Sequence, residues 1–267
     1  MNREPAVAGQ FYSGSPLGLK QQVRSYLIAD VRKQHAIGMV CPHAGFIYSG
    51  GVAGAVYSAV VPPNTFVLLG PNHTGIGAAA AMYGSGQWQI PTALFSIDAQ
   101  LGELIRAKDP LLEIDASAHA MEHSLEVQLP FIAETSPSAR ILPIALRRQS
   151  LDECRLLGEA VAAAIRECGY PVTIVSSTDM SHYVNVDTAR RLDHLALEHI
   201  IALDPEGLYE TVHSRQISMC GIYPTTTMLF AARSLGAKQA QLLQYATSGE
   251  VSGDYAQVVG YAGLIIA

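Results

Sequence analysis

The stretch "TFVLLGPNHTG", residues 65–75, has the features of a buried strand followed by a tight loop. Its first part is apolar on both faces, which is typical of a central strand in a sheet that helices cover on both sides. Pro71 stops the strand, and His73 follows between that proline and Gly75. In open α/β sheets, the loops that leave the carboxyl ends of the strands bind ligands. The stretch therefore predicts a covered sheet and places His73 at its functional edge.

Similar apolar runs recur along the chain and predict further strands of the same sheet. Helical patterns lie between several of them: Leu157 and Val161 share one helical face, and residues 222–235 have Pro224 in the first turn and Gly236 after the end. This alternation predicts an α/β protein, with a single three-layer α/β/α domain and a mostly parallel or mixed sheet. The domain is expected to span residues 1–267. The runs are residues 36–41, 78–83, 140–146, 172–177, 240–246 and 257–266, and we expect the last two to be antiparallel.

The composition excludes several classes of protein. Of the 267 residues, 49% are hydrophobic and 15% are charged, which suits a folded chain with a buried core. The formal net charge is −6 and the lysines and arginines are scattered, so we expect no nucleic-acid partner. No apolar run approaches the ~20 residues that span a bilayer, and residues 1–14 lack the apolar core of a signal peptide. We therefore expect no membrane partner and a cytoplasmic location.

Polar side chains with metal-binding or acid–base chemistry follow three of the predicted strands. His43, His73 and His182 each lie within a few residues of a strand end, and Asp179 precedes His182. Because parallel strands deliver their carboxyl ends to one edge of a sheet, we expect these side chains to lie together. Imidazole binds iron, zinc, copper and nickel, so His43 and His73 are candidate metal ligands. Asp179 and His182 are a candidate acid and base, with a helix N-cap as the alternative for Asp179.

Cys220 is the candidate for a third metal ligand. It comes just before the helix predicted at 222–235, where a thiolate would gain from the helix N-terminus. A free cysteine also commonly packs as a small buried hydrophobe, and the sequence leaves the two alternatives open. Asn72, beside His73, is expected to support the turn or to form part of the pocket wall.

Residues 118–131, "AHAMEHSLEVQLPF", have a helix-like pattern with two histidines. His119 and His123 would share one helical face, and with Glu122 they match the H-x-x-E-H pattern of inverted zincins. Because so short a pattern also arises by chance, we favour a different role, in which His123 and Glu122 line the edge of the pocket formed by the strand ends. Glu126 would extend the acidic face of the same helix.

Seven stretches, in order along almost the whole chain, resemble the Memo family, the B component of the AmmeMemoRadiSam group. Such an ordered set of matches is highly specific. The stretches are "REPAVAGQFYSG", "PHAGFIYSGGVAG", "LLGPNHTG", "EHSLEVQLPF", "STDMSHY", "MCGIYPTTTML" and "SGEVSGDYAQVVGYAG".

The resemblance implies an α/β/α fold related to the class III (LigB-type) extradiol dioxygenases, which are non-haem Fe(II) enzymes. His43 and His73 match the two histidine ligands of those enzymes, and Cys220 falls where they place a carboxylate ligand. His182 matches their acid/base histidine, and Asp179 accompanies it. Cys220 departs from the pattern of those enzymes, which have a carboxylate at this position. A soft thiolate shifts metal preference towards copper or zinc.

Three functions follow as hypotheses. The first is a metal-dependent oxidoreductase with a mononuclear metal pocket, Fe(II) expected and Cu or Zn as alternatives, which acts on a small substrate. The second, with a basis in the resemblance, is a non-catalytic adaptor whose pocket binds a peptide or phosphopeptide. The third is a zinc-dependent hydrolase built on "HAMEH" (119–123). The family resemblance also implies a pathway link to a radical-SAM protein.

Overall fold

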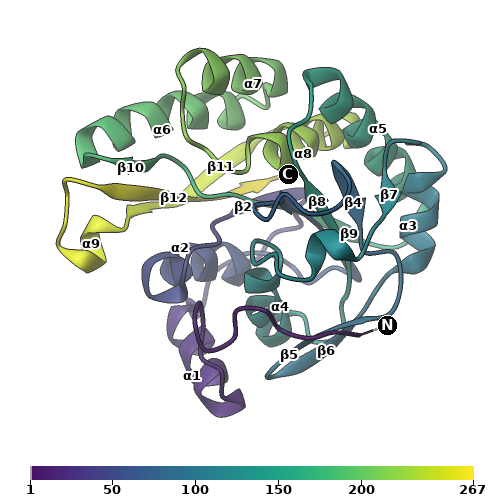
Figure 1. Cartoon of the computed structure of the whole chain (residues 1–267), viewed down its shortest axis with the longest axis horizontal. Coiled ribbons are helices and arrows are strands. Elements are labelled where there is room, and N and C mark those ends of the chain that lie inside the picture. The colour runs from purple at the N-terminus through teal and green to yellow at the C-terminus, as the bar shows by residue number, and fades with distance from the viewer. Residues whose placement is uncertain (1) are drawn as a thin grey trace.

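A nine-stranded mixed sheet lies at the centre of the computed structural model, which describes residues 2–267 (Figure 1). The middle of the sheet is parallel and its strands are buried on both faces, as the apolar runs predict. Two of the predicted runs, 140–146 and 172–177, coincide with strands to the residue. In spatial order the parallel strands are β2 (Gly38–Cys41), β9 (Val172–Ser177), β3 (Thr65–Pro71) and β8 (Arg140–Leu146).

Antiparallel strands extend this parallel centre on both sides. β12 (Val258–Ile266) pairs with β2, and β11 (Ala240–Thr247) pairs with β12, so the predicted antiparallel pair at the end of the chain is confirmed. A short strand, β10 (His182–Val184), joins the start of β12. Beyond β8 lie β4 (Ala80–Met82) and β7 (Glu113–Ile114).

Helices cover both faces of the sheet and confirm the three-layer α/β/α architecture (Figure 1). The helix at 222–235 begins and ends as predicted, because Gly236 closes it in the left-handed conformation with φ of 93°. The layer drawn below the sheet contains α1 (Pro16–Tyr26), α2 (Phe46–Ser58) and α4 (Leu129–Thr135). The layer above contains α5 (Leu151–Cys168), α6 (Val186–Ile201), α7 (Pro205–Ser214) and α8 (Ile222–Leu235), with α3 (Ala99–Arg106) packed on α5. A single helical turn, α9 (Gly249–Ser252), precedes β12.

A small second sheet was not predicted from the sequence. It joins β1 (Asn2–Arg3), β5 (Gln87–Ile90) and β6 (Ala93–Ser96), and Trp88 is fully buried in it. Strands this short carry too few residues to show a periodic pattern.

The helix expected over 118–131 is wrong. Two single turns of 3₁₀ helix, Ser117–His119 and Glu126–Gln128, flank an irregular segment, and the α-helix begins only at Leu129. The buried carboxylates of Glu122 and Glu126 accept hydrogen bonds from other loops, and these contacts outweigh the local helical pattern. His119 and His123 therefore do not share a helical face.

Among the helices of residues 2–267, none is long and apolar enough to cross a lipid bilayer.

Candidate metal centre

Three histidines meet at the carboxyl edge of the sheet. His43 follows β2, His73 follows β3, and His123 comes from the irregular segment before α4. One potential ligand atom from each lies within 4.8 Å of those of the other two. In the part of the chain from residue 2 to 267, no other trio of histidine, cysteine or acidic side chains meets this criterion. The strand ends thus bring His43 and His73 together as the sequence predicts.

The three imidazole rings pack directly on one another. His73 and His123 stack with ring centroids 4.7 Å apart, and His43 meets them edge-on at 5.2 and 5.5 Å. Phe11, from the loop before α1, packs on His123 with a centroid distance of 4.6 Å. His43 is buried, whereas 35% of the side-chain surface of His73 is exposed. The cluster is therefore buried at His43 and open to solvent at His73.

The environment of His43 determines which of its ring nitrogens is free. Ser177 Oγ donates its only proton to Ser124 O at 2.6 Å, and it accepts a hydrogen bond from Gln128 Nε2 at 2.9 Å. The 2.9 Å contact between His43 Nδ1 and Ser177 Oγ must then have the ring as donor. In the neutral ring the lone pair lies on Nε2, the nitrogen left for a metal.

Glu122 lies beside the other two rings and accepts a hydrogen bond from one of them. Its Oε1 accepts hydrogen bonds from His73 Nδ1 at 3.0 Å and from the Ser124 amide at 2.8 Å, and it lies 3.4 Å from His123 Nδ1. Burial alone would raise the pKa of Glu122, but the hydrogen bond and charge of His73, with the Ser124 amide and His123, lower the pKa to about 2. An ionised carboxylate only accepts, so Nδ1 of His73 carries a proton, and in a neutral ring the lone pair is then on Nε2.

Burial also favours the neutral, metal-binding form of His43 and His123. It lowers the pKa of His43 well below the ordinary value, and the charges of His73, His123 and His182 act in the same direction. Burial likewise lowers the pKa of His123. Neutral imidazole is the metal ligand, so these shifts favour metal binding over protonation.

Cys220 lies beside the cluster. Its Sγ is 3.2 Å from His43 Nε2 and 3.3 Å from the amide nitrogen of Asp179. Burial raises the pKa of the thiol, and the charge of Asp179 raises it further. The third side chain of the trio is His123, which was predicted to line the edge of the pocket, and not Cys220. A metal-ligating role for Cys220 stays a prediction.

Asp179 and His182 follow β9 at the same edge but do not orient one another. The buried carboxylate of Asp179 accepts a hydrogen bond from the His43 amide at 2.8 Å, and burial raises its pKa to about 6. His182 Nδ1 instead donates to the carbonyl of Ser218 at 2.9 Å. This bond leaves Nε2 of a neutral His182 as a proton acceptor.

Two further side chains have structural roles. Asn72 accepts hydrogen bonds from the amides of Thr74 and Gly75, both at 3.1 Å, and so shapes the loop that carries His73. His119 is buried away from the trio, with Nε2 3.0 Å from the carbonyl of Ala81, and packs on Trp88. The "HAMEH" pattern therefore does not form a two-histidine zinc site.

A model of the Memo family, described as Memo-like protein, matches residues 3–265. The chain belongs to the Memo family. It is 40% identical over 266 residues to a MEMO1 family protein of Methanosarcina barkeri, with 99% of each chain covered. It is 38% identical to MEMO1 family proteins of Methanopyrus kandleri, over 99% of each chain, and of Methanothermobacter thermautotrophicus, over 99% of this chain and 100% of that one.

The crystal structure of an uncharacterised protein from Escherichia coli K12 shares the fold. Its TM-score against this Memo family chain is 0.57 at 11% identity, with 85% of this chain and 98% of that chain covered. A likeness at this level of identity concerns the architecture of the sheet and its helices alone.

Sequence reasoning missed the polar side chains that hold His43 of this Memo protein. Ser177, Gln128 and Ser124 form one buried hydrogen-bonded group behind the ring. The pair of serines that ends the apolar run "VTIVSS" (172–177) was the available signal, because a buried hydroxyl requires a partner.

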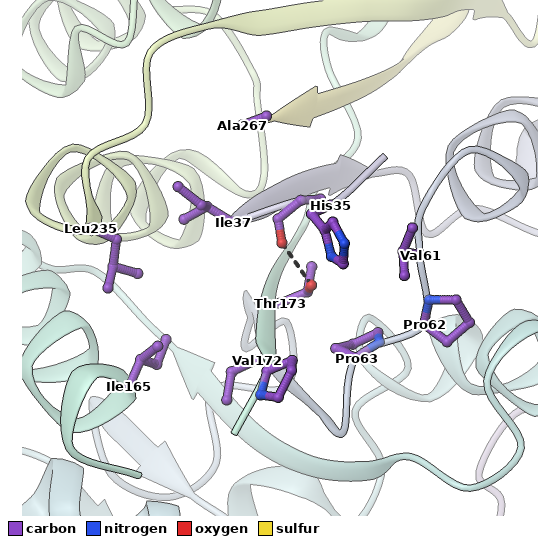
Figure 2. Close-up of a pocket in the computed structure, with 12 residues that line it drawn as sticks. His35, Ile37, Val61, Pro62, Pro63, Ile165, Val172, Thr173, Leu235 and Ala267 are labelled. Atoms are coloured by element: carbon purple, nitrogen blue, oxygen red, sulfur yellow. Dashed lines mark hydrogen bonds between the residues drawn. The ribbon is translucent and has the colours of Figure 1, made fainter. Parts of the chain in front are cut away.

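A cavity of about 450 Å³ lies at the opposite end of the same strands (Figure 2). Figure 2 shows proline and aliphatic side chains from the segments that lead into β2 and β3, from the start of β9, and from α5 and α8. Ligands of open α/β sheets bind at the carboxyl ends, so this amino-end cavity is distinct from the histidine cluster. Its lining includes His35, Ile37, Pro62, Pro63, Ile165 and Val172.

Proposed function

We propose that this Memo family protein is a metal-dependent oxidoreductase that acts on a small oxidisable substrate, with His43, His73 and His123 binding one metal ion. The observation that carries the proposal is that one potential ligand atom from each of the three rings lies within 4.8 Å of those of the other two. In His43 and His73, the nitrogen that faces the protein is already hydrogen-bonded. Metal-binding histidines characteristically use one nitrogen for the metal and the other for such a partner.

The donor set suits a transition metal rather than calcium or magnesium. Neutral imidazoles bind iron, copper and zinc, whereas calcium and magnesium prefer oxygen ligands. Cys220 Sγ is 3.2 Å from His43 Nε2. Cys220 Sγ is not among the three atoms that lie within 4.8 Å of one another, so Cys220 as a further donor is a prediction that rests on this one distance and on the family resemblance. Fe(II) is our first expectation from the extradiol-like resemblance, with copper and zinc as the alternatives that a thiolate favours.

The remaining side chains would bind and deliver protons. A bound iron or copper ion would supply redox chemistry. His182 would accept a proton at Nε2, because the Ser218 carbonyl holds its Nδ1–H. Asp179 would position His43 through its hydrogen bond to the His43 amide.

Metal analysis of anaerobically prepared protein tests the proposal. We expect one equivalent of transition metal in the wild-type protein and loss of that metal in His73→Ala. His213→Ala is the matched control, because His213 is an exposed histidine outside the cluster. Cys220→Ser should change the absorption spectrum of the copper- or cobalt-loaded protein if the thiolate is a ligand. Wild-type protein without stoichiometric metal, or His73→Ala with unchanged metal, would contradict the proposal.

Turnover requires a second readout. Loss of oxygen consumption in His182→Gln with retained metal would support the proton-transfer role of His182. If peptide or phosphopeptide binding persists after chelation and disappears in His73→Ala, the adaptor function replaces the enzyme.

A further inference from the structure

Strand β11 forms an open edge of the central sheet. It hydrogen-bonds to β12 on one side, and within residues 2–267 no strand pairs with its other side. Its sequence, "AQLLQYAT" (240–247), contains no charged residue and no proline. Lysine and proline are two of the means by which natural edge strands prevent further pairing. The edge is therefore chemically able to accept another strand.

The backbone groups that face outward can be identified from the pairing. Gln239 and Ala267 exchange two hydrogen bonds, at 3.0 and 2.9 Å, so they form a hydrogen-bonded pair. In an antiparallel ladder the inward and outward positions alternate. The amides of Ala240 and Leu242 consequently point away from β12. The register then shifts between Leu242 and Gln244.

Two grooves flank this edge, one on each face of the sheet. On the α6 side, Leu242 and Tyr245 line a groove of about 500 Å³. On the opposite face, Gln241 and Leu243 contribute to a groove of about 660 Å³. Side chains of an added strand would alternate between these two grooves. The edge thus offers both main-chain hydrogen bonds and places for side chains.

Cationic side chains line both grooves, and no acidic residue lines either of them. Arg190 and Arg191 stand on the α6 side, and Arg32 and Lys33 on the other. None of the four is in a salt bridge within the described part of the chain, residues 2–267. Four unpaired cations stand out in a chain with a formal net charge of −6.

We propose that the free edge of β11 binds an extended, acidic segment of another protein, which adds a strand to the sheet. The outward amides would supply the main-chain pairing, and the four cations would select carboxylates on the partner. A second copy of this chain is a poorer occupant, because pairing β11 with itself would bring the same cations together. This surface is separate from the histidine cluster, so the proposal does not depend on a bound metal.

The test is fluorescence anisotropy of the full chain with a short fluorescein-labelled peptide in which glutamate alternates with valine and threonine. We expect saturable binding that weakens as salt is raised. A second peptide has the same sequence but carries N-methyl groups on alternate backbone amides, which retains its charge and blocks strand pairing. We expect this peptide to bind at least about tenfold more weakly.

Variants of the chain separate backbone pairing from charge. Ala240→Pro removes an outward amide without removing a bond to β12, and it should abolish peptide binding while metal content is retained. Arg190→Glu combined with Arg191→Glu should weaken binding about tenfold. Lys20→Glu, an exposed cation on α1, is the control and should have no effect.

Four outcomes would overturn the proposal. They are no binding of the acidic peptide, equal binding of the N-methylated peptide, displacement of the peptide by a single-stranded oligonucleotide, and a dimer that dissociates in Ala240→Pro. The third would assign the surface to nucleic acid, and the fourth to a second copy of the chain.

Discussion

Glu122 and Glu126 lie four residues apart and are both buried, yet they stabilise different parts of the protein. Glu126 forms an ion pair with Arg3 at 2.7 Å and accepts hydrogen bonds from the N-terminal loop, including the Tyr12 hydroxyl at 2.6 Å. Glu122 instead bonds the ring of His73 at 3.0 Å. Glu126 thus stabilises the packing of the N-terminal loop, whereas Glu122 hydrogen-bonds a side chain of the candidate metal centre. The two glutamates differ in role because different distant segments of the chain pack against their carboxylates.

The largest effect is expected from Glu126→Ala. Removing one partner of a buried ion pair leaves the Arg3 guanidinium uncompensated, which costs about 3–5 kcal/mol of unfolding free energy. Urea denaturation would measure the loss. Glu103→Ala removes a half-exposed pair with Arg106 and should cost below about 1 kcal/mol. If the two variants lose similar stability, Glu126 does not have the scaffold role.

Glu122→Gln should affect the metal more than the fold. The amide keeps the size of the side chain but loses its charge and one strong acceptor for the His73 ring. Metal affinity should fall about 10–100-fold, as for other changes to partners of metal-binding histidines. A competition titration with a chelator measures this change. Unchanged affinity alongside a large loss of stability would make Glu122 a second scaffold residue.

Acid should lower the free energy of unfolding of the metal-free protein, in part because the Glu122 carboxylate becomes protonated. Its pKa in the folded protein is about 2, below the ordinary value of 4.5. Its contribution to stability is therefore complete above pH 4.5 and is lost as the pH falls from there towards 2. Stability measured by denaturation across this range should decline less steeply in Glu122→Gln. Equal slopes for the two proteins would show that Glu122 is not the responsible group.

Asn72→Ala should have the smallest effect. The side chain caps the amides of Thr74 and Gly75, and such a local hydrogen-bonded turn contributes about 1 kcal/mol. We expect a small loss of stability and a modest loss of metal affinity through looser placement of His73. An increase in hydrogen exchange confined to residues 73–76 would locate the change. Exchange that increases throughout the sheet would instead indicate a global role.

The sequence and the structure agree best where one element carries its own signals. The strands at 140–146 and 172–177 and the helix at 222–235 have the predicted bounds, because apolar runs and the stop at Gly236 are local features. The segment 118–131 fails for the opposite reason. Its pattern is helical, but Glu122 and Glu126 bond loops that are distant in the sequence.

The sequence by itself determined the alternation of strands and helices, the family, and the release of His43 and His73 at strand ends. Those properties depend on side-chain type and spacing over a few residues. Only the tertiary structure decided that His123 completes the trio, that Ser218 orients His182, and that β11 is an open edge. Each of these depends on which distant segments meet, and a buried polar group takes the partner that the packed chain brings to it.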